Sequence, residues 1–193
     1  MPPWGGIPTL AGPTLETFNG TQPAFLTLGG TAFITTGPNY SVAYVPPFFS
    51  GSQAAYFGEA PASGLDTSKY VVVEAAASAT FNFSTPQSYF GLMWGFVDAN
   101  NTLSFYDSAN NLLGSINGNQ IPASVGGGVG AHGTSFVEAF STAPFSKVVA
   151  TATINSFEID DVVYAQTVPE PASGLLLTAG LVGLGYFSRR KSA

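Results

Sequence analysis

The feature that most limits the fold of this chain is a series of short apolar runs separated by turn residues. The runs have the length of β-strands, and the clearest cover residues 79–83, 89–97, 102–106, 112–116, 135–140, 147–154 and 157–165. Several alternate in polarity with period two: Leu103 and Phe105 oppose Thr102, Ser104 and Tyr106. No run has the apolar spacing of a helix. The pattern predicts an antiparallel all-β domain.

The segments between the runs contain residues that tolerate tight turns. Residues 37–39 read Gly-Pro-Asn, residues 107–111 read Asp-Ser-Ala-Asn-Asn, and residues 117–119 read Asn-Gly-Asn. These residue types predict a hairpin over 102–116. About a dozen strands are too many for one flat sheet, so we expect two sheets packed face to face in a jelly-roll-like sandwich.

Composition divides the chain of 193 residues into three parts. Residues 1–14 hold four prolines and three glycines, and we expect no regular structure there. Residues 15–166 form the expected sandwich, and a chain that is 45 % apolar can give it a core. Residues 167–193 form a tail of different character, which contains a single short transmembrane helix at about 172–187.

Charge and cysteine content exclude several functions. Ten acidic residues and only two lysines precede Val168, a formal charge of −8, so the body should repel phosphate backbones and nucleic acid is not an expected partner. There is no cysteine, which rules out disulfides, thiolate metal sites and cysteine nucleophiles.

The tail joins a proline strip to an apolar segment and a basic end. Val168, Pro169, Glu170 and Pro171 come first, and residues 172–187 follow without a charge. As a helix these residues would span roughly 24 Å, which is short for a hydrocarbon core of ~30 Å. Arg189, Arg190 and Lys191 then act as stop-transfer cations, which leaves the body outside the membrane. A plain C-terminal anchor with a proline stalk is the alternative.

This combination resembles the PEP-CTERM sorting domain of bacterial proteins that are processed by exosortase, a membrane-embedded cysteine peptidase. The resemblance covers Val168 to Lys191. It implies an exosortase substrate that is held transiently in the inner membrane, processed near Pro169 to Pro171, and passed to the cell surface or an extracellular matrix. Residues 1–8 lack the basic and apolar regions of a signal peptide, so we expect such a signal upstream of Met1.

The body is more loosely similar to domains found in front of such tails. The residues that carry this similarity are 89–98, 101–107 and 157–164. It implies a sandwich of the kind shared with carbohydrate-binding modules, and polysaccharide is therefore an expected partner. Exposed aromatic side chains could stack on sugar rings, and Tyr40, Tyr44, Phe48 and Phe49 are candidates, whereas Trp94 is expected in the core. A shared fold implies no activity.

No catalytic residue is predicted. His132 is the only histidine and lies in a glycine-rich stretch, so neither a histidine metal site nor a Ser/His/Asp triad is indicated. We therefore expect a non-catalytic surface protein. The alternative is an exported glycan-active hydrolase, which needs two carboxylates across a cleft, and no sequence pattern pairs any two of those available.

The last strand of the body raises the question of a metal. Glu158 and Asp160 should share one face of it, while Asp161 points with Phe157 and Ile159 toward the apolar side. A buried carboxylate must be compensated. Either backbone amides satisfy it, or a structural Ca²⁺ is bound by Glu16, Asp160 and Asp161.

Overall fold

The computed structural model describes residues 10–41, 44–49, 57, 64–122, 133–154 and 156–167. Within them the predicted all-β sandwich is confirmed, and a short 3₁₀ turn, η1, covers Gly118–Gln120. The strands are β1 (Leu10–Glu16), β2 (Leu26–Gly29), β3 (Phe33–Thr36), β4 (Phe48–Phe49), β5 (Gly64–Leu65), β6 (Lys69–Val73), β7 (Ser78–Gly95), β8 (Asn101–Tyr106), β9 (Leu112–Asn117), β10 (Ser135–Ala152) and β11 (Phe157–Thr167).

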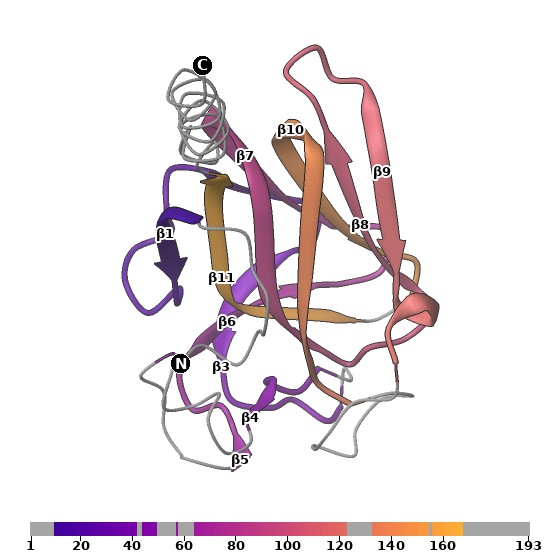
Figure 1. The fold of residues 1–193 in the computed structure, drawn as a ribbon. Helices are drawn as coiled ribbons and strands as arrows, with labels where there is room; N and C mark the ends of the chain where they lie inside the picture. Colours follow the sequence, from indigo (N-terminus) through magenta and orange to yellow (C-terminus); the bar gives the residue numbers. More distant parts are fainter. Residues whose placement is uncertain are drawn as a thin grey trace, which may run out of the picture.

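The two layers of the sandwich share their longest strands. β7 and β10 have 18 residues each and lie side by side (Figure 1). The first part of β7 pairs with β2, and its last part pairs with β11. The strands thus form one nine-stranded sheet folded into two layers. Its path is β3-β6-β11-β7-β10-β8-β9, with β1 added beside β11 and β2 beside β7, and β4 pairs with β5 separately. This differs from two independent sheets because four of the predicted runs merge into two bent strands.

The main core fills the space between the layers. It is built largely from aromatic side chains, and Trp94 stacks on Phe157 with 4.4 Å between the ring centroids. The predicted core position of Trp94 is confirmed, since its side chain is fully buried. A smaller apolar cluster lies on the other face of β7 and β11 and includes Phe49, Met93 and Val163.

The predicted hairpin over 102–116 is confirmed as β8 and β9, which pair in antiparallel register. Its turn is held by Asp107, whose carboxylate accepts hydrogen bonds from the backbone N–H groups of Ala109 and Asn111 at 2.9 and 2.8 Å. Asn110 adopts a φ of 68°, a conformation that asparagine tolerates better than most residues.

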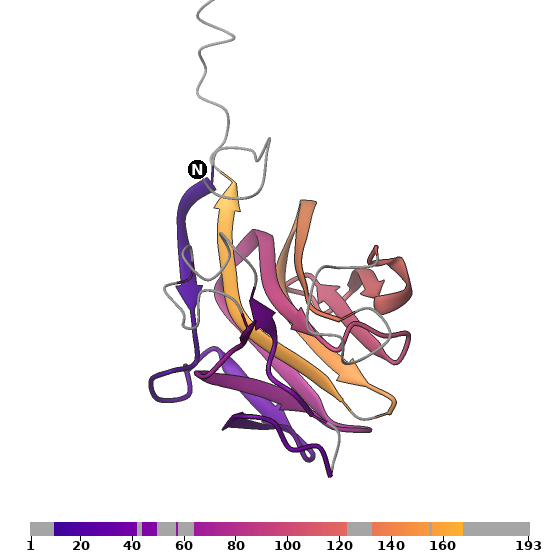
Figure 2. The same ribbon diagram turned by 90° about the horizontal axis from the view of Figure 1, so that it is seen from below.

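β1 begins earlier than the proline and glycine content suggests. It starts at Leu10, inside the segment 1–14, and pairs with β11 (Figure 2). The register shifts between Ala11 and Thr14, where Gly12 has a φ of 46°. Among the described strands β1 pairs with β11 alone, and a bulge on such a strand accommodates Pro13 because no second described strand requires its missing N–H.

The tail lies outside the described residues. This applies to the sorting residues Val168 to Pro171, to the expected helix over 172–187, and to Arg189, Arg190 and Lys191. His132 also lies outside them. In the part of the chain that the structure describes, no helix is long and apolar enough to cross a membrane. The tail helix stays a prediction.

Candidate ligand-binding groove

A groove opens where β7 crosses from one layer to the other. β2 pairs with residues 78–81 of β7, and β11 pairs with residues 89–95. Between them, along this edge of β7, the described strands provide no partner for residues 83–88. The gap forms a groove of about 650 Å³, a size typical of small-molecule sites.

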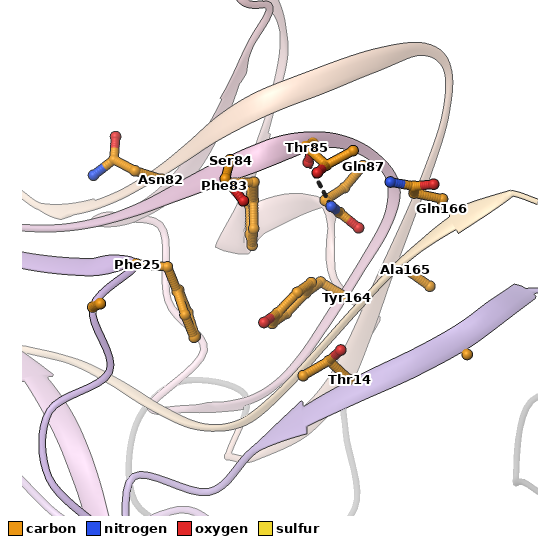
Figure 3. Close-up of a pocket in the computed structure, with 12 residues that line it drawn as sticks. Thr14, Phe25, Asn82, Phe83, Ser84, Thr85, Gln87, Tyr164, Ala165 and Gln166 are labelled. Carbon is orange, nitrogen blue, oxygen red and sulfur yellow. Dashed lines mark hydrogen bonds between the residues drawn. The ribbon is translucent and has the colours of Figure 1, made fainter.

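The floor of the groove is aromatic. Phe25, Phe83 and Tyr164 meet there from three separate segments of the chain (Figure 3). The rings of Phe83 and Tyr164 are 4.9 Å apart, those of Phe25 and Tyr164 are 5.2 Å apart, and those of Phe25 and Phe83 are 6.0 Å apart. Phe83 is nearly buried, whereas Phe25 and Tyr164 remain half-exposed. The floor thus offers apolar ring surface to a ligand.

Neutral polar side chains surround this floor. The hydroxyl and amide groups that line the groove belong to Thr14, Asn82, Ser84, Thr85, Gln87 and Gln166. Gln87 is fixed by a 2.5 Å hydrogen bond that its Nε2 donates to the Thr85 carbonyl, as drawn in Figure 3. Amides and hydroxyls both donate and accept hydrogen bonds, so this rim matches a ligand rich in hydroxyl groups.

A β-bulge in β11 turns Tyr164 into the groove. The register shifts between Asp160 and Val163, and Asp161 between them has a φ of 46°. Before the bulge Phe157 and Ile159 face the main core, and after it Val162 and Tyr164 face that side. Without the extra residue, strict alternation would place Tyr164 on the opposite face. Alternation of polarity along the sequence therefore does not predict that Tyr164 faces the groove.

The aromatic residues that were expected to stack on sugars lie elsewhere. Phe49 is fully buried in the smaller apolar cluster, and Tyr44 packs edge-on against Phe33 at 5.4 Å. Tyr40 is 70 % exposed but does not line the groove. Phe48 is half-buried in β4. The groove instead takes its rings from chain segments that no local sequence pattern links.

Two of the three residues proposed for calcium accept hydrogen bonds from backbone N–H groups. Glu16 Oε1 accepts a 2.8 Å hydrogen bond from the Phe18 backbone N–H. Asp160 Oδ1 accepts one of 2.8 Å from the Asp161 backbone N–H, and Asp161 is fully buried at the bulge. Among the residues that the structure describes, no three His, Cys, Asp or Glu side chains are grouped to hold a metal ion. The calcium site stays a prediction.

Calcium binding can be tested directly on stability. A ligand that binds only the folded state raises the melting temperature by mass action, so the calcium hypothesis predicts that excess EDTA lowers it by several degrees. The measurement is a thermal melt of the full-length protein with and without chelator. An unchanged curve, together with an elemental analysis that finds no metal, would reject calcium as the group that compensates these buried carboxylates.

Several carboxyl groups are buried together on one face of β11. Glu158 and Asp160 share one face of β11, as predicted, but both are fully buried and neither is exposed to water. Asp66 is buried beside Asp160, and Ser68 Oγ donates to both carboxylates, at 2.7 Å to Asp66 and 3.4 Å to Asp160. Glu158 Oε1 accepts a hydrogen bond from Ser156 Oγ.

Burial sets the protonation of these acids. It raises the pKa of Glu158 to about 8, because a charged carboxylate loses its hydration there. Burial also raises the pKa of Asp160, and the neighbouring carboxyls of Asp66 and Asp161 raise it further. Neither Glu158 nor Asp160 lines the groove, so this acid cluster is separate from it.

Comparison with known proteins identifies the tail. Residues 167–191 match the model of the PEP-CTERM protein-sorting motif. The predicted resemblance is confirmed over this segment, and the motif indicates an exported protein. It begins at the last residue of β11, directly after the groove residue Gln166.

Comparison of the structure with solved ones finds distant likenesses. The K2 cleaved adhesin domain of Lys-gingipain is 10 % identical over 80 % of this chain and 99 % of that one, with a TM-score of 0.47. A carbohydrate-binding module of Cellvibrio mixtus lichenase 5A in complex with cellotriose is 10 % identical over 83 % and 100 %, with a TM-score of 0.39. No curated protein matches the sequence. At these values the function has to be argued from the chain's own residues.

Proposed function

We propose that this chain is a non-catalytic, exported surface or matrix protein whose sandwich binds polysaccharide in the groove. The observation that carries the proposal is the aromatic floor of Phe25, Phe83 and Tyr164 within a rim of neutral amides and hydroxyls. The apolar face of a sugar ring can lie on such a floor, while its hydroxyls bond to the rim. A small number of precisely placed polar groups around an apolar surface is typical of ligand sites.

The sorting motif supports the route to the surface. In this proposal the apolar segment after Pro171 holds the chain briefly in the inner membrane, and the terminal cations keep its end in the cytoplasm. Exosortase then acts near Pro169 to Pro171 and releases the sandwich to the cell surface or an extracellular matrix. Because the groove lies on the sandwich, its ligand would be an extracellular glycan.

The hydrolase alternative gains no support from the groove. Glycoside hydrolysis needs a carboxylic acid and a carboxylate on opposite sides of the scissile bond. None of the described residues that line the groove is acidic. Glu158 and Asp160 are fully buried, and Glu138 accepts a 3.0 Å hydrogen bond from Tyr89 Oη away from the groove. This arrangement supports binding without catalysis.

Substitution of the groove floor tests the proposal. Tyr164→Ala should weaken binding to a retained polysaccharide roughly tenfold, since an aromatic contact contributes about 0.5–1.5 kcal/mol beyond its buried area. Tyr164→Phe, which keeps the ring, should retain most of the affinity. The measurement is affinity electrophoresis or calorimetry with the full-length chain in mild detergent.

Tyr40→Ala provides the matched control, because it removes an exposed tyrosine that does not line the groove. It should bind like the wild type. Thermal melts of each variant confirm that the fold is retained. Equal binding by Tyr164→Ala and the wild type would exclude the groove as the glycan site.

A further inference from the structure

The electrostatics of the groove bear on which polysaccharides can enter it. No charged side chain is among the described residues that line it. The body around it carries a formal charge of −8 before Val168. A ligand with carboxylate or sulfate groups would therefore meet neither a cation nor a favourable field.

Neither cation of the body lines the groove, although Lys147 on β10 is the register partner of the groove residue Asn82, and the ammonium groups of both lysines are engaged elsewhere. Lys69 Nζ donates a 3.1 Å hydrogen bond to the Gly20 carbonyl. Lys147 Nζ lies 4.3 Å from the centre of the Tyr106 ring and donates to Asn110 Oδ1. Neither lysine lines the groove, and the next cations in the sequence are those of the tail from Arg189 onward. The described residues that line the groove thus offer an anion no positive charge of their own.

Electrostatic repulsion from the acidic body disfavours the binding of negatively charged polysaccharides. Two like charges 10 Å apart repel by only about 0.4 kcal/mol in bulk water. A polysaccharide with one acid on every sugar presents many such charges to many carboxylates, and the cost adds up unless salt screens it. A neutral sugar escapes this cost and keeps the ring stacking and the amide hydrogen bonds.

We infer that the groove selects neutral polysaccharides and rejects those that carry carboxylate or sulfate groups. The inference rests on the proposed glycan-binding function and specifies its ligand class. It also identifies Gln166, an exposed neutral residue beside Tyr164 on β11, as a position where charge decides the class of ligand.

The test is a binding panel with the full-length chain in mild detergent. Neutral polymers such as xylan, β-glucan and galactomannan are compared with alginate, polygalacturonate and a sulfated galactan. At least one neutral polymer should bind, with an affinity that changes less than about twofold between roughly 0.05 and 0.5 M salt. The anionic polymers should not bind at low salt.

A charge variant sharpens the test. Gln166→Lys should raise affinity for an anionic polymer at low salt by roughly fivefold, and added salt should abolish the gain. Ser108→Lys, which adds the same charge at an exposed hairpin turn outside the groove, should not.

The outcomes separate the inference from the function beneath it. If an anionic polymer binds the wild type and Tyr164→Ala weakens that binding, the groove binds glycans but the neutral class is wrong. If no polymer of either kind binds, the glycan-binding function fails and the inference with it. Equal gains from Gln166→Lys and Ser108→Lys would show that net charge, and not the groove, controls the ligand class.

Discussion

Replacement of Pro169, Glu170 and Pro171 by alanine is expected to keep the protein full length in the inner membrane of a host that has an exosortase. The wild type, supplied with a functional signal peptide, should lose the residues after the proline strip and appear outside that membrane. The reason is that a sorting enzyme must recognise the strip, whereas the apolar segment and terminal cations suffice for anchoring. Mass spectrometry of the mature C-terminus measures the difference.

The same experiment distinguishes a plain anchor from a sorting signal. A plain anchor predicts identical mass and location for the wild type and the triple-alanine form, because neither the apolar segment nor the cations have changed. A matched control replaces Ser108 and Leu112, two exposed residues outside the motif, by alanine and should be processed normally. Retention of Arg189 to Ala193 on the wild type would make the processing hypothesis wrong.

The fold class was predictable because its signals are local. Alternation of polarity over residues 102–106 and turn residues over 107–111 specify a hairpin without help from the rest of the chain. The sorting motif was recognisable for the same reason, since its proline strip, apolar segment and cations are contiguous in sequence. Local patterns do not show that two separate runs belong to one long strand. The merging of runs into β7 and β10 was therefore missed.

The groove was not predictable because each of its parts depends on tertiary structure. Phe25 precedes β2, Phe83 lies in the crossing segment of β7, and Tyr164 lies near the end of β11. Only the pairing of β2 and β11 with different parts of β7 brings these rings together. The bulge at Asp161 adds a second difficulty, since one extra residue places every later side chain of β11 on the opposite face of the sheet.

The buried acids show a different limit of sequence reasoning. Alternation correctly placed Glu158 and Asp160 on one face of β11, opposite Phe157 and Ile159. It did not reveal that residues 44–49 and 64–68 lie over that face. The Val45 backbone N–H contacts Glu158 Oε1 at 3.4 Å, and Asp66 lies beside Asp160. Burial of this face depends on chain segments more than ninety residues away in sequence.

These buried acids should make the protein less stable as the pH rises. The folded-state pKa of Glu158 is raised from an ordinary 4.5 to about 8, so the folded state keeps a proton that the unfolded chain releases. Unfolding therefore releases protons between these two values, and the free energy of unfolding falls across that window. Below about pH 4 this loss of stability is absent, and above about pH 8 it is complete. Asp160, whose pKa is also raised, acts in the same direction.

The expected effect is large. Each unit of pKa shift corresponds to about 1.4 kcal/mol, so several kcal/mol are at stake in Glu158. For a domain of this size, the melting temperature should fall by roughly 10 °C between about pH 5 and pH 8. Thermal melts at constant ionic strength measure this. The groups that face the cluster are Tyr70, Asp66, Asp98 and Asp161, all neutral or negative, so none of them offsets the trend with a positive charge.

Glu158→Gln isolates the contribution of this one carboxyl. The amide oxygen can accept the hydrogen bonds from Ser156 and Val45, and the amide mimics the protonated acid, so the variant should match the wild type near pH 5. At pH 8 the variant should melt several degrees above the wild type. The fall in its melting temperature with pH should then be only the part that Asp160 causes. Glu74→Gln, at a partly exposed glutamate, controls for loss of one negative charge. If the melting temperature of Glu158→Gln falls with pH as steeply as that of the wild type, Glu158 is not the group that loses its proton on unfolding.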